Sequence, residues 1–241
     1  MPACCVGIDI GATNLKAGLL TRQGKLLTQK VVRLTKKDKS EAGIVTAVTN
    51  MVERLAQENR VATRELLGVG IGVAGVIDAR AGLITDSPNF PAWKNFPLAE
   101  RLSQVLHLPV TIENDVNAVA LGEHFAGATK GVPNFLCMAL GTGLGGAIFL
   151  DGRMWRGVEG MAGEVGHLCV YPDGALCGCG SRGCLETVAS QTGLVRRIKA
   201  DNFRKVLDDV ETESAIPYAL AVLAQNGDPQ AQAYWDEVGR A

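Results

Sequence analysis

Two short glycine-rich turns, each placed between apolar runs of strand length, constrain the fold of this chain most. Residues 9–16 read Asp-Ile-Gly-Ala-Thr-Asn-Leu-Lys, and residues 140–146 read Leu-Gly-Thr-Gly-Leu-Gly-Gly. Such turns expose backbone N–H groups, which can hold polyphosphate, and the first turn adds a carboxylate that can hold hydrated Mg²⁺. The first turn by itself also fits a plain hairpin. Two of them, one in each half of the chain, favour two domains that each grip phosphate.

Neither turn is followed by the helix that a Walker motif or a dinucleotide fingerprint requires. The first turn instead lies in a predicted meander of three strands, at residues 4–10, 15–20 and 25–34. A helix is predicted over residues 40–59, because apolar side chains recur there at helical spacing, at Ile44, Val48, Met51, Val52 and Leu55.

Strands and helices then alternate, with strands predicted at residues 67–73 and 110–112 and helices at 98–106 and 116–126. Strands resume at residues 135–140 and 146–150, and the sequence from residue 185 onward is largely helical, with Asp228 and Pro229 opening its last helix. This alternation predicts an α/β fold with mixed sheets. We expect a first domain over residues 1–130 and a second over residues 131–241.

Charge and hydropathy exclude two classes of partner. The 241 residues carry 24 Lys+Arg and 25 Asp+Glu, a net charge of -1, which gives no electrostatic footprint for nucleic acid. No apolar run approaches the roughly 18 residues that a membrane span needs. The N-terminus reaches a carboxylate at Asp9 without a basic head or a long apolar stretch, so we expect no signal peptide and a cytoplasmic protein.

Asp115 follows the predicted strand at residues 110–112 and opens a helix. Aspartate is a preferred N-cap, so a capping role is one interpretation. The other is a general base that accepts a proton from a substrate hydroxyl as it attacks a phosphoryl group. The two roles are compatible, because a helix N-terminus favours the ionised carboxylate.

A cluster of cysteines indicates a metal site. Cys177, Cys179 and Cys184 lie close together in sequence, ten residues after His167. Three thiolates and one imidazole complete a tetrahedral Zn²⁺ site and leave no position for water, so the zinc is predicted to be structural. The alternative is three buried or reactive thiols in a loop. Glu164 and Glu186 flank these residues, and the metal site would hold both carboxylates rigidly.

Together these motifs resemble the ROK family of sugar kinases and repressors, within the actin-like, hexokinase-like ATPase superfamily. The resemblance extends from Val6 to about Glu186. Besides the two glycine turns it rests on residues 72–78 (Gly-Val-Ala-Gly-Val-Ile-Asp), 87–89 (Ser-Pro-Asn), 113–117 (Glu-Asn-Asp-Val-Asn), 164–167 (Glu-Val-Gly-His) and 177–186, of which the last is the most specific.

The resemblance implies two actin-like (ribonuclease H-like) domains around an interdomain cleft, and ATP-dependent phosphorylation of a hexose, usually at its 6-hydroxyl. Asp115 would be the base. The sugar would be held by Asn89, Asn114, Asp115, Glu164, His167 and Glu186. The phosphates and Mg²⁺ would be held by Asp9, Gly11, Thr13, Asn14, Lys16, Gly141, Thr142, Gly143 and Gly145. We also expect His167 to serve twice, with one ring nitrogen on zinc and the other toward the sugar, and we expect a homodimer.

Glucose is the favoured substrate, with N-acetylglucosamine and N-acetylmannosamine as alternatives. A sugar-sensing regulator is disfavoured, because only eight residues precede Asp9 and the repressors of the family carry a helix-turn-helix segment there. A non-catalytic sugar-binding or zinc-binding module is the remaining alternative. Family members continue past residue 241 with an adenosine motif and further strands, so the second domain is expected to be incomplete at its C-terminus, with an open sheet edge prone to association.

Overall fold

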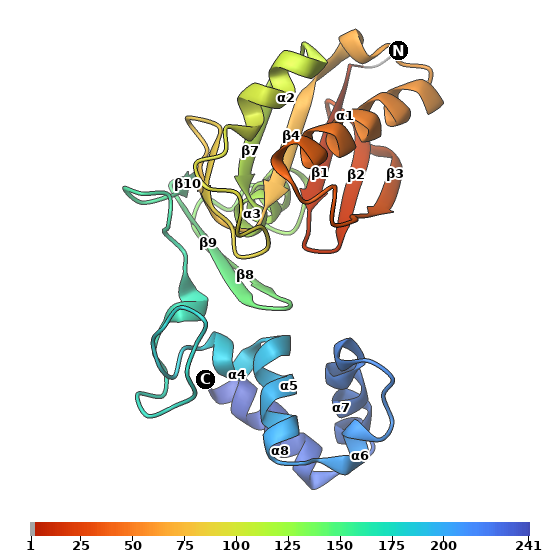
Figure 1. The fold of residues 1–241 in the computed structure, drawn as a ribbon. Helices are drawn as coiled ribbons and strands as arrows, with labels where there is room; N and C mark the ends of the chain where they lie inside the picture. Colours follow the sequence, from red (N-terminus) through yellow and green to blue (C-terminus); the bar gives the residue numbers. More distant parts are fainter. Residues whose placement is uncertain (1–2) are drawn as a thin grey trace. The chain divides into compact units, whose positions relative to one another are not determined.

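The structure is a computed structural model that describes residues 3–241 (Figure 1). The chain forms two compact units, described separately below. The first comprises Met1–Phe135 and Ala147–Ala162, and the second comprises Leu136–Gly146 and Gly163–Ala241. The boundary expected at residue 130 between two actin-like domains stays a prediction, since these units are defined by compactness within this chain. Among residues 3–241, no helix is long and apolar enough to cross a membrane.

A five-stranded mixed sheet forms the centre of the first unit, in the order β3-β2-β1-β4-β7. The predicted meander is confirmed: β1 (Cys4–Ile10), β2 (Asn14–Thr21) and β3 (Leu26–Arg33) pair antiparallel in sequence order. The other side of β1 pairs parallel with β4 (Leu66–Val73), which pairs parallel with β7 (Val110–Asn114). Parallel pairing brings the carboxyl ends of these three strands to one edge of the sheet, where the first glycine turn and Asp115 follow.

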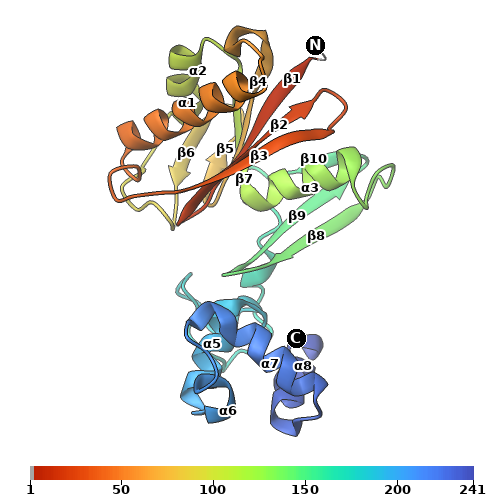
Figure 2. The ribbon, with the colours of Figure 1, turned by 90° about the vertical axis from the view of Figure 1, so that its right-hand side faces the viewer.

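Three helices cover this sheet, two on one face and one on the other (Figures 1 and 2). α1 (Glu41–Glu58) and α2 (Leu98–Leu106) share a face, and α3 (Asp115–Ala126) lies opposite. A single turn of 3₁₀ helix, Thr63–Glu65, precedes β4. All five apolar positions that predicted α1 are buried, and the Ser40 hydroxyl caps its first turn by accepting from the Gly43 N–H at 3.0 Å.

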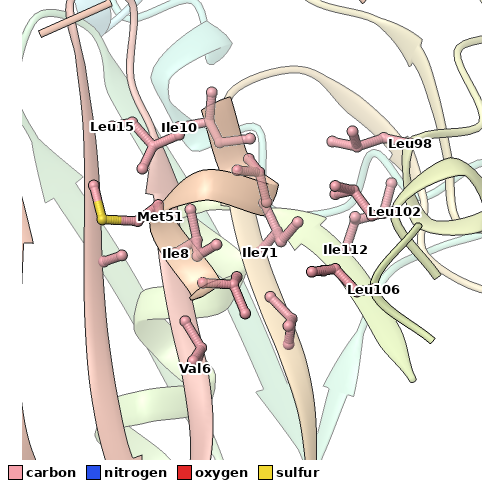
Figure 3. Packing of buried hydrophobic residues seen from close by; sticks show 14 of the residues in the cluster. Val6, Ile8, Ile10, Leu15, Met51, Ile71, Leu98, Leu102, Leu106 and Ile112 are labelled. Atoms are coloured by element: carbon pink, nitrogen blue, oxygen red, sulfur yellow. The ribbon is translucent and has the colours of Figure 1, made fainter. Parts of the chain in front are cut away.

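The core of the first unit lies between the sheet and the α1–α2 layer. Figure 3 shows Leu98, Leu102 and Leu106 of α2 directed at Ile112 of β7 and Ile71 of β4. Side chains three or four residues apart on a helix lie on the same face, and every second side chain of a strand lies on the same face of the sheet. The apolar face of α2 therefore packs on the apolar face of the sheet in one layer. This layer holds the carboxyl ends of β1, β4 and β7 in fixed register.

Three short strands were not predicted. β5 (Val76–Asp78) and β6 (Leu83–Asp86) form a hairpin after β4, and β10 (Arg153–Trp155) pairs antiparallel with β9 (Leu144–Leu150). With three or four residues each, they are too short to show the alternation that identifies a strand. β8 (Phe135–Leu140) completes a three-stranded sheet of order β10-β9-β8.

The second unit is mostly helical after its cysteine-rich loop, as predicted. Its elements after that loop are α4 (Glu186–Ala189), α5 (Gln191–Ala200), α6 (Arg204–Leu207), a 3₁₀ turn at Glu213–Ala215, α7 (Ile216–Gln225) and α8 (Pro229–Arg240). The predicted start of the last helix is confirmed, because Asp228 accepts from the Ala231 N–H at 3.0 Å and Pro229 is its first residue. The apolar faces of α5, α7 and α8 form a small core of their own around Ile198, Leu220 and Tyr234.

Candidate active site and metal centre

Asn114, the last residue of β7, is the N-cap of α3. Its Oδ1 accepts from the N–H groups of Val116 and Asn117, at 2.9 and 3.1 Å. The interpretation of Asp115 as the N-cap is therefore wrong by one residue, and Asp115 is the first residue of the helix. Both types are good caps, and the structure uses Asn114 because β7 runs two residues further than predicted.

The side-chain amide of Asn114 also reaches the loop that follows β4. Its Nδ2 donates to the Gly75 carbonyl at 3.2 Å. Gly75 has a φ of 143°, and a Cβ there would lie 2.2 Å from the Asp86 carbonyl oxygen, so the close approach requires glycine. The nearby Ser87 is buried and donates its hydroxyl to the Ala74 carbonyl at 2.7 Å. Asn114 thus joins two of the motifs that carry the family resemblance.

The Asp115 carboxylate is half-buried beside Asp9 of β1. Burial raises the pKa of Asp115 above its ordinary value of 3.8, and the charge of Asp9 raises it further, while a hydrogen bond from the Val116 N–H lowers it in part. Asp9 is itself paired with Lys16, whose Nζ lies 3.4 Å from its Oδ2. The structure therefore brings together the proposed base and the charged residues of the first glycine turn.

The first glycine turn is a hairpin between β1 and β2. The Gly11 N–H donates to the Asn14 carbonyl at 2.9 Å, and the Thr13 carbonyl accepts from the Leu34 N–H at 2.8 Å. Thr13 and Lys16 are exposed. The turn is thus held by its own backbone and by the end of the meander, and its predicted grip on phosphate stays a prediction.

The second glycine turn is held by the segment that follows the cysteine cluster. The carbonyl of Gly141 accepts from the Gln191 N–H at 2.9 Å, and the carbonyl of Thr142 accepts from the hydroxyl of Thr192 at 2.7 Å. Glu186 Oε2 accepts from the Leu144 N–H at 2.9 Å. A Cβ at Gly143 would lie 2.4 Å from that same oxygen, so a larger residue there would displace the Glu186 carboxylate. The exposed residues Gly141 and Thr142 form the tip of the turn.

The predicted metal ligands lie together in the second unit. One donor atom from each of His167, Cys177, Cys179 and Cys184 falls within 4.8 Å of all the others. Cys177 Sγ lies 3.6 Å from His167 Nδ1, and the Sγ atoms of Cys179 and Cys184 lie 3.7 Å apart. A tetrahedral zinc site with bonds of about 2.0–2.3 Å has ligand atoms about 3.5–3.8 Å apart, whereas a disulfide needs about 2.05 Å. These residues fit a metal ion and are not a disulfide.

The flanking carboxylates touch this cluster. Glu164 Oε2 lies 3.9 Å from His167 Nε2, the other ring nitrogen from the one that lies 3.6 Å from Cys177 Sγ, and Glu186 Oε1 lies 3.8 Å from Cys177 Sγ. Cys184 is fully buried, and burial raises the pKa of its thiol to about 12, whereas the Ser181 N–H lowers the pKa of the exposed Cys179. A bound cation would convert both to thiolates.

The remaining predicted sugar residue, Asn89, is half-buried in the loop after β6. The neighbouring Phe90 and Trp93 are buried and stack with ring centroids 3.9 Å apart, which anchors this loop to the core. Asn89, Asn114 and Asp115 belong to the first unit, and Glu164, His167 and Glu186 belong to the second. Their roles toward a sugar stay predictions.

Sequence reasoning missed a group of three hydrogen-bonded polar residues centred on Glu113, two residues before Asp115. Glu113 is 9% exposed and Asn117 is 4% exposed, and Asn117 Nδ2 donates to Glu113 Oε1 at 3.1 Å. Arg156 donates to Glu113 Oε2 from Nε at 2.9 Å and from Nη2 at 2.5 Å. Glu113 and Asn117 stood in a recognised motif without an assigned role. Arg156 gave no local signal, because its partner lies 43 residues earlier in the chain.

The family model described as "ROK family" matches residues 5–241. A curated glucokinase of Halalkalibacterium halodurans is 41% identical over 192 residues, which are 79% of this chain and 58% of that protein. A glucokinase of Thermotoga maritima is 35% identical over 92% of this chain and 66% of its own length. A xylose repressor of Caldicellulosiruptor bescii is 33% identical over 80% of this chain and 48% of its own length.

Solved structures agree with these relatives. A ROK family glucokinase from Streptomyces griseus, in complex with glucose and AMPPNP, superposes with a TM-score of 0.78 and 36% identity, covering 99% of this chain and 76% of that chain. The ROK hexokinase from Thermus thermophilus gives a TM-score of 0.80 and 36% identity, covering 98% of this chain and 74% of that chain. The chain thus spans about three fifths to two thirds of the curated glucokinases it matches. By its family model, its relatives and its actin-like α/β architecture, this chain belongs to the ROK family.

Proposed function

We propose that this protein is an ATP-dependent hexose kinase that phosphorylates the 6-hydroxyl of glucose. The observation that carries the proposal is the Asp115 carboxylate, which is half-buried at the carboxyl end of β7 and whose pKa burial raises. A carboxylate whose pKa is raised by burial is a stronger base than an exposed one. The similarity to curated glucokinases supports the same activity.

In the proposed reaction, Asp115 accepts the proton of the 6-hydroxyl as that oxygen attacks the γ-phosphorus of ATP. The bond from the γ-phosphorus to the bridging oxygen breaks, and ADP leaves with the electron pair. Catalysis then depends mainly on positioning and on neutralising charge. Asn89 and Asn114 of the first unit, and Glu164, His167 and Glu186 of the second, are proposed to hold sugar hydroxyls.

The two glycine turns are proposed to hold the phosphates. The exposed residues Thr13, Lys16, Gly141 and Thr142, with the partly exposed Gly11, Asn14, Gly143 and Gly145 beside them, are proposed to supply hydroxyl, ammonium and backbone N–H donors. Asp9 would hold Mg²⁺ that enters with ATP, since its side chain is 49% exposed and offers the oxygen ligands that Mg²⁺ prefers. The ion would neutralise charge on the phosphates.

The cluster of His167, Cys177, Cys179 and Cys184 is proposed to hold one structural Zn²⁺. The donor distances and the donor set of three thiols and one imidazole support this assignment. The zinc would fix the loop that carries Glu164 and Glu186. His167 would use Nδ1 for the metal, which leaves Nε2 for a sugar hydroxyl.

N-acetylglucosamine or N-acetylmannosamine is the alternative substrate, and a sugar-sensing regulator is the alternative of another class, which the similarity to xylose repressors supports. A pure sensor has no need of a half-buried base beside Asp9, and this favours the kinase. A cytoplasmic location is proposed because reduced cysteines persist there. The homodimer is proposed on the family resemblance alone.

The test is ADP release by this chain with Mg-ATP and glucose, mannose, N-acetylglucosamine or N-acetylmannosamine, with Asp115→Asn as control. Turnover of one sugar that the variant loses by more than about 10²-fold would support the kinase and identify its substrate. Glucose binding in calorimetry without any turnover would instead favour a sugar-binding protein.

A further inference from the structure

We propose that Arg156 is a positioning residue for the catalytic end of β7, and that it acts through Glu113. The inference rests on the proposed kinase function of Asp115 and assigns a role to residues outside the predicted site. We refer to Arg156, Glu113 and Asn117 together as the β7 clamp.

The carboxylate of Glu113 is saturated with hydrogen bonds. Oε2 takes both donors of Arg156, Nε at 2.9 Å and Nη2 at 2.5 Å. Oε1 accepts from Asn117 Nδ2 and from the Asn114 N–H, each at 3.1 Å. Charge-assisted bonds of this kind are about twice as strong as neutral ones, and the planar guanidinium also fixes the orientation of its partner. Glu113 is therefore held in one position.

Because the Glu113 carboxylate is buried, it depends on its pairing with Arg156. The Glu113 side chain is 12% exposed, whereas that of Arg156 is 38% exposed. A buried carboxylate that loses its cation must either take up a proton or move toward water. The asymmetry means that removing Arg156 disturbs Glu113 more than removing Glu113 disturbs Arg156, which can turn to solvent.

The bonds of the β7 clamp lie on both sides of Asp115, the proposed base, in the sequence. Glu113 immediately precedes Asn114, and its Oε1 holds the N–H of that residue. Asn117 stands one turn along α3, and its own N–H donates to Asn114 Oδ1 at 3.1 Å. Asp115 lies between these two fixed points. A shift of Glu113 would therefore move the N-cap and the first turn of α3, together with the base.

Arg156 is itself fixed by the loop that follows it. Its carbonyl accepts from the Ala162 N–H at 3.0 Å, which closes the segment between them. Within that segment Gly160 has a φ of 78°, and a Cβ there would lie 2.9 Å from the Ile77 carbonyl oxygen. The arginine thus reaches Glu113 from a loop that packs against the β5–β6 hairpin. A mobile surface arginine would hold the carboxylate less firmly.

The experiment compares Arg156→Met, Arg156→Lys and the double variant Glu113→Gln/Arg156→Met with the unchanged protein. Arg101→Met is the matched control, since Arg101 pairs with Glu41 at 3.5 Å on the surface of the same unit. Steady-state kcat and KM are measured on the sugar that the unchanged protein turns over. Amide exchange is measured at Val116 and Asn117.

For Arg156→Met we expect kcat to fall about 10-fold or more with KM for the sugar changed less than about threefold, because misplacing a base acts on the transition state. Arg156→Lys should recover part of this loss by restoring the cation. The double variant should recover part of it as well, because the neutral amide has no charge to desolvate. Arg101→Met should match the unchanged protein.

Amide exchange tests the positioning role of Arg156 independently of the proposed kinase activity. In Arg156→Met, exchange at Val116 and Asn117 should accelerate about 10-fold or more while exchange in α1 is unchanged. If exchange changes as expected but the unchanged protein transfers no phosphoryl group to any sugar, the kinase proposal fails and the clamp stands. The inference is overturned if Arg156→Met leaves kcat and the exchange of both amides unchanged, or if neither Arg156→Lys nor the double variant recovers either readout.

Discussion

Glu186 Oε2 accepts a hydrogen bond from the backbone N–H of Leu144 at 2.9 Å, while the Oε1 of the same carboxylate lies 3.8 Å from Cys177 Sγ. One side chain thus connects the second glycine turn with the proposed zinc site. Since Gln191 and Thr192 also bond the carbonyls of this turn, its conformation depends on a segment that begins only two residues after Cys184. We therefore expect loss of the metal to disturb the conformation of the second glycine turn.

Replacing Gly143 by alanine tests this connection. The added Cβ would lie 2.4 Å from Glu186 Oε2, so the carboxylate must move and the Leu144 bond must lengthen or break. We expect the free energy of unfolding to fall by about 1 kcal/mol, the usual net value of the one hydrogen bond that is lost. Urea unfolding measures it, with Gly141→Ala as the matched control, because no heavy atom lies within 4 Å of a Cβ at Gly141. Equal losses in the two variants would show that the contact with Glu186 is unimportant.

Removing the metal should destabilise the second unit. We expect the purified protein to contain about one zinc ion per chain, and we expect chelation or Cys184→Ser to lower the thermal midpoint of this unit by about 10 °C or more, because binding energy at a structural site is folding energy. Metal analysis and calorimetry check both results. Cys169→Ser is the control, since Cys169 is exposed and lies outside the four-residue cluster. Full stability after complete loss of metal would contradict a structural role.

Asp115→Asn should abolish turnover and yet stabilise the protein at neutral pH. The pKa of Asp115 is raised in the folded protein above 3.8, so the folded state binds this proton more tightly than the unfolded state does. The stability of the unchanged protein therefore falls as the pH rises from about 3.8 through the folded pKa. Asparagine does not ionise, so the variant avoids this loss of stability, and the amide oxygen of asparagine can still accept from the Val116 N–H.

The difference between the two proteins should consequently be small at low pH, grow through the titration and stay constant above it. Urea unfolding at several pH values measures this profile. A variant that is less stable than the unchanged protein at neutral pH, or a difference that does not depend on pH, would show that burial of the carboxylate is not the dominant influence on Asp115.

The parts of this fold that sequence predicted are those with a strong local signal. The five apolar positions of α1 are all buried, because an amphipathic pattern over 18 residues has few alternatives. The metal cluster was predicted for a similar reason, since three of its four ligands stand within eight residues. The second unit's glycine turn was predicted as a turn, but its bonds to Glu186 and Thr192 depend on contacts 42 and 50 residues apart.

The errors have physical causes as well. β5, β6 and β10 are too short to show a period, and the register at the start of α3 was ambiguous because Asn114 and Asp115 both make good caps. Arg156 could not be found, since nothing near it in sequence marks a partner in β7. Each of these features is decided by packing between distant segments, which composition and spacing do not report.

Asn114 offers a way to separate its two structural roles. Serine at this position keeps a capping oxygen for the first turn of α3 but loses the Nδ2 donor to the Gly75 carbonyl, and alanine loses both. We expect Asn114→Ser to cost about 1 kcal/mol of unfolding free energy, the usual net value of one hydrogen bond. Asn114→Ala should cost about 1 kcal/mol more, for the lost cap.

Ser40→Ala in α1 is the comparison for a cap, because the Ser40 hydroxyl accepts from the Gly43 N–H; it also donates to the Lys37 carbonyl nearby in sequence. This variant should lose at least as much stability as separates the two Asn114 variants. Equal stability of Asn114→Ser and Asn114→Ala would show that the cap contributes nothing, and unchanged stability of Asn114→Ser would show that the Gly75 contact does not tie the loop after β4 to the start of α3.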